Sequence, residues 1–168
     1  MMEWNRPRSV RQIGSVPGRE RIYVEDYVMR FAKRLAAKQS DNEKAAMLLG
    51  NQYHYNGQKI VQISGIVEIP QFARRNSPVL SPQSWDSVYT EIKENFTDLD
   101  IVGWFYTARD FDRQDAGKLL EIHKANFQHR DKVLYILDEK EQEDGMFLYH
   151  MGNFERQQGY YIYYEKNP

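Results

Sequence analysis

The sequence predicts an α/β (α+β) domain in which helices flank one mixed β-sheet. Segments with apolar residues at helical spacing alternate with short apolar runs rich in Ile, Val and Tyr, and turn residues separate the two kinds of segment. The chain has 168 residues, the length of one domain, and its hydrophobic fraction of 41% is typical of a folded protein. We therefore expect one globular unit over most of the chain.

Residues 1–21 are interpreted as an extended basic arm in front of a domain at residues 22–168. The arm mixes prolines and glycines with arginines, a composition that disfavours regular structure. Only Trp4 could stack on a base among these arginines. We therefore prefer an arm that packs on its own domain or on a protein, and we keep nucleic-acid binding as a third hypothesis.

The first half of the domain predicts a helix followed by a strand pair. Residues 23–38 carry Tyr27, Phe31 and Leu35 at positions i, i+4 and i+8, which indicates an amphipathic helix. An apolar run at 43–49 and a β-branched run at 58–69 flank the turn Asn56-Gly57, which favours a hairpin.

The second half predicts two helices and four strands. Residues 83–96 place five apolar side chains at helical spacing, and this stripe is interpreted as core: Trp85, Val88, Tyr89, Ile92 and Phe96. Residues 101–106 form a compact apolar run that is typical of a buried strand. A helix at 115–127 and strands at 132–137, 146–150 and 159–164 complete the expected order.

Composition excludes several functional classes. The formal charge of -1 creates no global field for nucleic acid, and the absence of cysteine removes thiol nucleophiles and cysteine-based metal sites. The chain has neither a glycine-rich phosphate loop nor a Gly-x-Ser-x-Gly motif. No stretch approaches the ~20 apolar residues that span a bilayer. We expect a cytoplasmic protein without a membrane span and without a cofactor.

The segment from Asp100 to Phe111 reads Asp-Ile-Val-Gly-Trp-Phe-Tyr-Thr-Ala-Arg-Asp-Phe. It resembles the JAB/MPN family, whose active members read Gly-Trp-Tyr-His-Ser-His-Pro-Gly-Tyr at this strand end. Gly103, Trp104 and Phe105 match in type and spacing, as does Phe111. The resemblance covers roughly residues 22–150 and implies a three-layer architecture of the MPN/cytidine-deaminase-like type.

The resemblance also implies a zinc site whose ligands are replaced here. In active members two histidines and an aspartate hold zinc, and a glutamate activates the bound water. Glu43 stands at the glutamate position, whereas Tyr106 and Ala108 occupy the histidine positions. Asp115 corresponds to the third ligand. The expected degenerate cleft comprises Glu43, Tyr106, Thr107, Ala108, Arg109, Asp112 and Asp115.

Two functions follow from this resemblance. The first is a catalytically inactive MPN-like domain that serves as a protein-interaction or dimerisation module, with an unidentified protein partner or a second copy of the chain. Tyr161 and Tyr163, on the last strand, are its candidate interface residues. The alternative is a metal-dependent hydrolase in which Glu43, Asp112 and Asp115 hold a hard ion such as magnesium or manganese.

The chain also resembles bacterial proteins that carry a cell-wall-binding LysM module downstream. No LysM residues are present here, and because the chain ends at Asn167-Pro168 directly after the last expected strand, we expect a longer parent protein.

Overall fold

The computed structural model describes residues 3–38, 42–109, 115–127 and 131–165, and the structural statements below refer to these residues. They form one nine-stranded sheet in the order β1-β9-β2-β4-β3-β5-β6-β7-β8. In chain order the elements are β1 (Val10–Gly14), β2 (Glu20–Glu25), α1 (Asp26–Ala37), β3 (Glu43–Tyr55), β4 (Gln58–Glu68), the short 3-10 helix η1 (Phe72–Arg74), α2 (Pro82–Asn95), β5 (Asp100–Ala108), α3 (Asp115–Asn126), β6 (Val133–Asp138), β7 (Glu143–His150), β8 (Asn153–Arg156) and β9 (Gly159–Tyr163).

The hairpin of β3 and β4 forms the centre of the sheet. Asn56 and Gly57 have positive φ angles of 50° and 74°, as a two-residue hairpin turn requires. On its other edge β3 pairs antiparallel with β5, which in turn pairs parallel with β6. The predicted hairpin is confirmed, and the sheet is mixed in direction.

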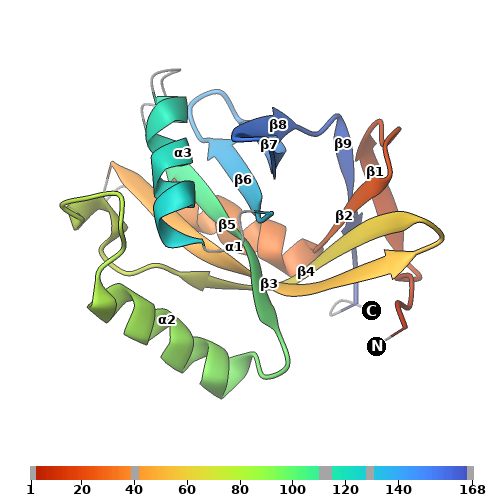
Figure 1. The fold of residues 1–168 in the computed structure, drawn as a ribbon, viewed down its shortest axis with the longest axis horizontal. Helices are drawn as coiled ribbons and strands as arrows, with labels where there is room; N and C mark the ends of the chain where they lie inside the picture. The colour runs from red at the N-terminus through yellow and green to blue at the C-terminus, as the bar shows by residue number, and fades with distance from the viewer. Residues whose placement is uncertain (1–2, 39–41, 110–114, 128–130, 166–168) are drawn as a thin grey trace.

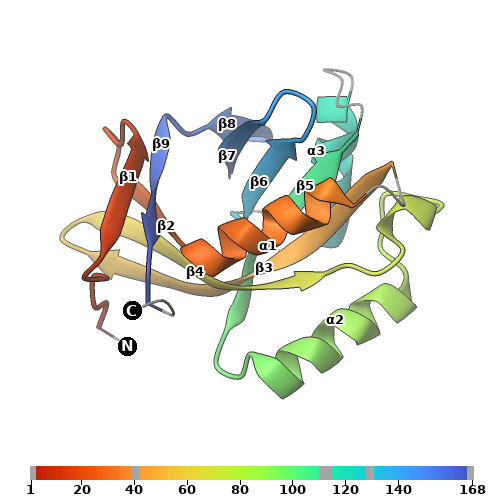
Figure 2. The ribbon, with the colours of Figure 1, turned by 180° about the vertical axis from the view of Figure 1, so that it is seen from behind.

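The sheet curls around α1. Figures 1 and 2 show this helix in the hollow of the sheet, with β1, β2 and β9 towards one end of it and β6, β7 and β8 towards the other. The helix turns four side chains into this hollow, none of them more than 4% exposed: Val28, Met29, Ala32 and Leu35. They join strand residues such as Ile63 and Phe105 in one hydrophobic cluster, so α1 fills the concave side of the sheet.

The opposite face of the sheet carries α2 and α3. Side chains of alternate residues in β3 point to opposite faces of the sheet. Leu48 belongs to the cluster around α1, whereas Met47 and Leu49 belong to a second cluster. That second cluster includes Val88 of α2 and Leu119 of α3. The central strands are therefore buried on both sides.

Two register shifts bend the sheet in the middle of β3. The pairing with β4 shifts between Leu49 and Gly50, and the pairing with β5 shifts between Leu48 and Leu49. Such bulges bend a strand and increase its local twist. A Cβ atom on Gly50 would lie 1.8 Å from the carbonyl oxygen of Gln62, so the close strand approach at this bend requires glycine.

The predicted three-layer architecture is wrong. Strands dominate the molecule, which is a curled, half-barrel-like sheet and not a flat sheet between two helix layers. The curl leaves room for one helix in its hollow, and on the convex face α2 and α3 pack against the second cluster, which is built largely on the central strands. Apolar periodicity identifies each element but does not report this curvature.

The N-terminal residues also differ from the extended arm that their composition suggests. Val10–Gly14 form β1, which pairs antiparallel with β9 from Val10↔Tyr163 to Gly14↔Gly159. Residues 20 and 21 already belong to β2, and Trp4 is buried against Tyr23. These residues are part of the sheet and of a third hydrophobic cluster around Trp4.

The sequence pattern did not predict β8, which pairs with β7 at the edge of the sheet.

Among the described residues, no helix combines the length and the apolar character that crossing a membrane demands.

Candidate functional site

Glu43, at the start of β3, has a nearly buried carboxylate with three hydrogen-bond donors. Its Oε1 accepts from Nη1 of Arg75 at 2.6 Å, and its Oε2 accepts from the hydroxyl of Tyr106 at 2.6 Å and from Nζ of Lys118 at 2.8 Å. The donors come from the loop after η1, from β5 and from α3. Residue 43 thus lies where these segments meet.

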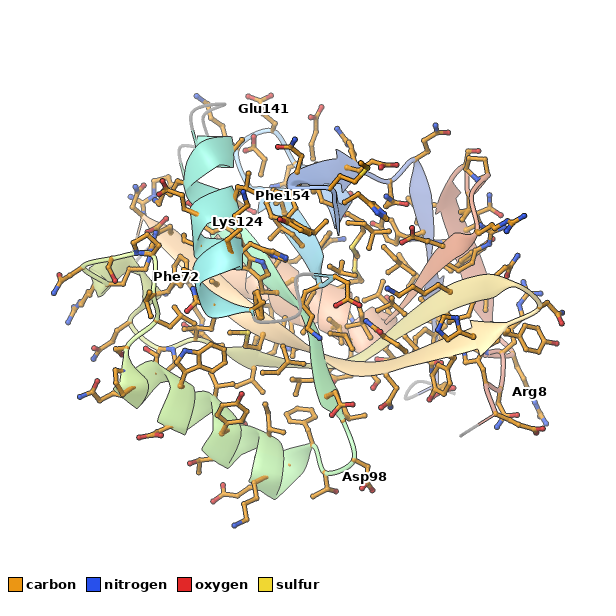
Figure 3. The ribbon with its side chains drawn as sticks, in the orientation of Figure 1. Arg8, Phe72, Asp98, Lys124, Glu141 and Phe154 are labelled. Carbon is orange, nitrogen blue, oxygen red and sulfur yellow. The ribbon has the colours of Figure 1, made fainter. Side chains whose placement is uncertain are left out.

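Arg75 is itself fixed in place. Its guanidinium lies 4.1 Å from the ring centroid of Phe72, and Nη1 also donates to the carbonyl of Phe72 at 2.9 Å. Figure 3 labels Phe72, the first residue of η1, beside α3. A stacked and hydrogen-bonded guanidinium loses less conformational freedom when it binds a carboxylate, which favours this ion pair.

The electrostatics keep Glu43 ionised. Burial raises the pKa of this carboxyl group, but hydrogen bonds from Lys118, Tyr106 and Arg75 lower it further than burial raises it, so its pKa lies below the ordinary value. A general base is most effective when its pKa is near the working pH. Glu43 is therefore a weak base whose two oxygens already accept hydrogen bonds from cations.

The residues that replace the expected histidines have structural roles. Tyr106 is 1% exposed and binds Glu43 through its hydroxyl, while Ala108 lies opposite Glu43 in the β3–β5 register. Among the described residues, no three His, Cys, Asp or Glu side chains are grouped closely enough to hold a metal ion. The Glu43 centre consists of one carboxylate, two cations and the Tyr106 hydroxyl.

Three of the other predicted cleft residues, Thr107, Ala108 and Arg109, line one small hollow together with Glu43. Thr107 donates its hydroxyl to the carbonyl of Leu137, and Arg109 is exposed with its backbone N–H bound to the carbonyl of Asn42. Asp112 lies outside the described residues, and so does the side chain of Asp115, whose backbone begins α3. The structure therefore brings Glu43 together with Tyr106, Thr107, Ala108 and Arg109, although the Thr107 hydroxyl is bound to β6 and not to Glu43.

The candidate interface tyrosines pack within the chain. Tyr163 has no exposed surface, and its hydroxyl lies 3.2 Å from the carbonyl of Ile63. Tyr161 is half-buried and stacks on Tyr23 with ring centroids 4.7 Å apart. Both therefore contribute to the core cluster around Trp4.

The pair that carries the JAB/MPN resemblance also has a structural role. A Cβ atom on Gly103 would lie 2.3 Å from the carbonyl oxygen of Val133, so glycine permits the close approach of β5 and β6. Trp104 is 1% exposed and donates its indole N–H to Nδ1 of His123, which is fully buried. Packing alone accounts for both residues.

Sequence reasoning missed a large open groove at the other end of β3. Its volume is about 860 Å³, and it is lined by Asn51, Gln52, Tyr53, His54, Trp85, Tyr89, Ile92, Leu99, Asp100, Ile101, Val102, Asn126, Phe127 and Lys132. The hollows next to Glu43 are smaller, about 200 Å³ and 330 Å³. Figure 3 labels Asp98 in the loop from α2 to β5, next in sequence to the groove residue Leu99.

Tyr89 shows why the sequence did not reveal this groove. Its helical spacing assigns it to the core stripe of α2, but its side chain is 55% exposed, whereas Val88 is fully buried. Tyr89 stacks on Trp85 with ring centroids 5.6 Å apart and an interplanar angle of 22°. The apolar stripe of α2 is wider than the part of the helix that packs on the sheet. The aromatic side chains of Trp85 and Tyr89, which extend beyond that part, line the groove.

The comparisons with known proteins bear on the fold alone. No family model matches the chain, and no curated protein matches it. The solution structure of protein DSY2949 from Desulfitobacterium hafniense is similar, with a TM-score of 0.56 and 13% sequence identity over 87% of this chain and 94% of that chain. At this identity the match indicates a shared fold over most of both chains.

Proposed function

We propose that this chain is a protein-binding domain in which the Glu43 centre performs no hydrolysis. The observation that carries the proposal is that Arg75, Lys118 and Tyr106 all donate hydrogen bonds to the Glu43 carboxylate. A hydrolytic glutamate must take a proton from water, and this one is held as an ion pair with a lowered pKa. The centre therefore ties β3, β5 and α3 together.

The groove supports binding as the activity of the domain. Binding sites in proteins are concave, largely apolar and supplied with a few polar groups, and the groove combines stacked Trp85 and Tyr89 with the amides of Asn51 and Gln52. The groove is larger than the two hollows next to Glu43 and lies at the opposite end of β3. A cytoplasmic location stays a prediction.

The proposal keeps the resemblance to the JAB/MPN family only for the sequence segment around Gly103. The three-layer arrangement that the resemblance implies does not apply to this chain. The hydrolase alternative would need Asp112 and the carboxylate of Asp115 beside Glu43, and those two side chains lie outside the described residues. The cations on Glu43 argue against it, because they compete with a metal ion for the same oxygens.

The test measures metal and hydrolysis on the full chain. We expect purified protein to contain zinc, manganese and magnesium well below one ion per chain, and to cleave peptide-linked and isopeptide-linked fluorogenic substrates no faster than Glu43→Gln does. Val79→Ala, a change at an exposed loop residue, is the control for effects of mutation and purification that are unrelated to Glu43. Cleavage by the wild-type protein that Glu43→Gln abolishes would refute the proposal.

A further inference from the structure

We propose that the groove takes an extended peptide segment of another protein, which joins the sheet as an additional strand beside residues 51–55 of β3. This inference rests on the proposed function and specifies its binding site, its mode of recognition and the class of its partner.

The open edge of β3 is the first argument. β3 has 13 residues and pairs with β4 as far as Tyr55, but its pairing with β5 ends at Gly50↔Asp100. Within the described part of the chain, no strand pairs with residues 51–55 on the side away from β4. At ~3.4 Å per residue this edge is about 17 Å long.

The lining of the groove shows that this edge faces it. Asn51, Gln52, Tyr53 and His54 all line the groove, although side chains of successive strand residues point to opposite faces of a sheet. A cavity that touches four successive residues must run along the edge of the strand. In an antiparallel ladder about half of the backbone N–H and C=O groups of such a segment point away from the paired strand. In the described part of the structure, these groups of residues 51–55 are open to a further strand.

The sheet is also split on the far side of the groove. The first pair between β5 and β6 is Gly103↔Val133, so residues 100–102 precede the β6 ladder. Ile101, Val102 and Lys132 line the groove there. The groove is therefore lined by the edge of β3, by the start of β5 and by the residue before β6.

The aromatic wall indicates which side chains the peptide carries. Tyr89 is 55% exposed and stacks on Trp85, and both line the groove from α2. Such rings bind an aromatic or large aliphatic side chain through apolar contact and ring stacking. We expect the peptide to place one such side chain against Tyr89.

Charge excludes nucleic acid as the occupant of the groove, and size excludes a second folded copy of the chain. The lining carries one carboxylate, Asp100, and one ammonium, Lys132, beside neutral amides. Nucleic acid would require several cations for its phosphates, so a peptide of low net charge is the complementary occupant. A second folded copy does not fit either, since stable dimers bury about 800 Å² and 20–30 residues on each partner, more than this groove offers.

The experiment selects peptides with the full chain as bait. The probe is a phage-displayed library of random heptapeptides, followed by synthetic copies of the selected sequences in fluorescence anisotropy. We expect an aromatic or large aliphatic residue at one position, and about tenfold weaker binding to Tyr89→Ala, as for a typical interface anchor. Val79→Ala, an exposed hydrophobic residue outside the groove, should change the dissociation constant less than twofold.

N-methylation of the peptide tests strand addition. Methyl groups on alternate backbone nitrogens should abolish binding in one phase of the alternation and be tolerated in the other, because only every second amide faces β3. Among the backbone amides of residues 51–54, those that point away from β4 should also exchange more slowly with solvent in the complex.

Failure of the inference differs from failure of the proposed function. Tight peptides that tolerate Tyr89→Ala and every N-methylation, or a library that yields no binder, would overturn strand addition. Hydrolysis that depends on Glu43 would instead overturn the proposed function.

Discussion

Nζ of Lys118 lies 2.8 Å from Oε2 of Glu43, although 75 positions separate the two residues in the chain. Arg75 binds the other carboxylate oxygen at 2.6 Å. The two cations differ in their environment, because the side chain of Lys118 is 42% exposed and that of Arg75 only 11%. We therefore expect Arg75 to contribute more than Lys118 to the stability of the fold.

Arg75→Met should destabilise the fold more than Lys118→Met. Removal of one partner from a buried ion pair costs about 3–5 kcal/mol, whereas an exposed lysine contributes about 0.2–1 kcal/mol because solvent screens its charge. Arg75→Met also removes the stack on Phe72. Urea unfolding of both variants at neutral pH measures the difference, and equal losses would contradict the assignment of Arg75 as the main partner of Glu43.

The contribution of Glu43 should depend on pH. The pKa of its carboxyl group is lower in the folded protein than the ordinary 4.5, so the folded state favours the ionised form. The resulting stability is fully present above pH 4.5 and is lost as the pH falls through the lower, folded-state pKa. We expect the difference in unfolding free energy between wild type and Glu43→Gln to shrink below this pH. A difference that stays constant down to pH 3 would show that the charge of Glu43 does not stabilise the fold.

Tyr160→Phe should loosen the closure of the curled sheet. The hydroxyls of Tyr135 in β6 and Tyr160 in β9 both donate to Oδ2 of Asp144 in β7, at 2.7 Å and 2.9 Å. This contact joins β9 to β7, which are far apart in the strand order. Burial, and next the charge of Asp144, raise the pKa of both tyrosines, so they remain donors.

A hydrogen bond to a charged group contributes about 1.5–3 kcal/mol, and we expect a loss of this size in Tyr160→Phe. Chemical unfolding measures it, and the backbone amides of β9 should exchange faster with solvent. Tyr55→Phe serves as the control, since the ring of Tyr55 is 46% exposed. A loss no larger than that of the control would show that the contact does not close the sheet.

Two glycine substitutions should have opposite effects. Gly103→Ala places a Cβ atom 2.3 Å from the carbonyl oxygen of Val133, so β5 and β6 must separate, at a cost of about 1–3 kcal/mol. Gly117→Ala, in α3, meets nothing within 4 Å and should stabilise the helix by about 0.5–1 kcal/mol, because alanine favours helices. Thermal unfolding of the two variants gives both signs. Equal effects would refute the close contact at Gly103.

The elements that sequence reasoning located best are those with strong local signals. The hairpin at Asn56-Gly57, the helix at 83–96 and the buried run at 101–106 follow from turn chemistry and apolar spacing, and each is present within a few residues of its expected bounds. β1 escaped notice because its pairing with β9 links residues that are far apart in sequence. The three-layer expectation failed because the curvature of the sheet arises from bulges in β3 and from pairing of strands that come from both ends of the chain.

The sequence alone determined which residues could not hold zinc at the Glu43 centre, since neither the hydroxyl of Tyr106 nor the methyl group of Ala108 replaces an imidazole. Only the tertiary structure decided what surrounds Glu43, because Arg75 and Lys118 reach it from loops and helices that no local pattern relates to β3. The same holds for the groove. It exists because β3 is longer than β5 on one side, and relative strand length is a property of pairing between distant segments that side-chain periodicity within one segment does not encode.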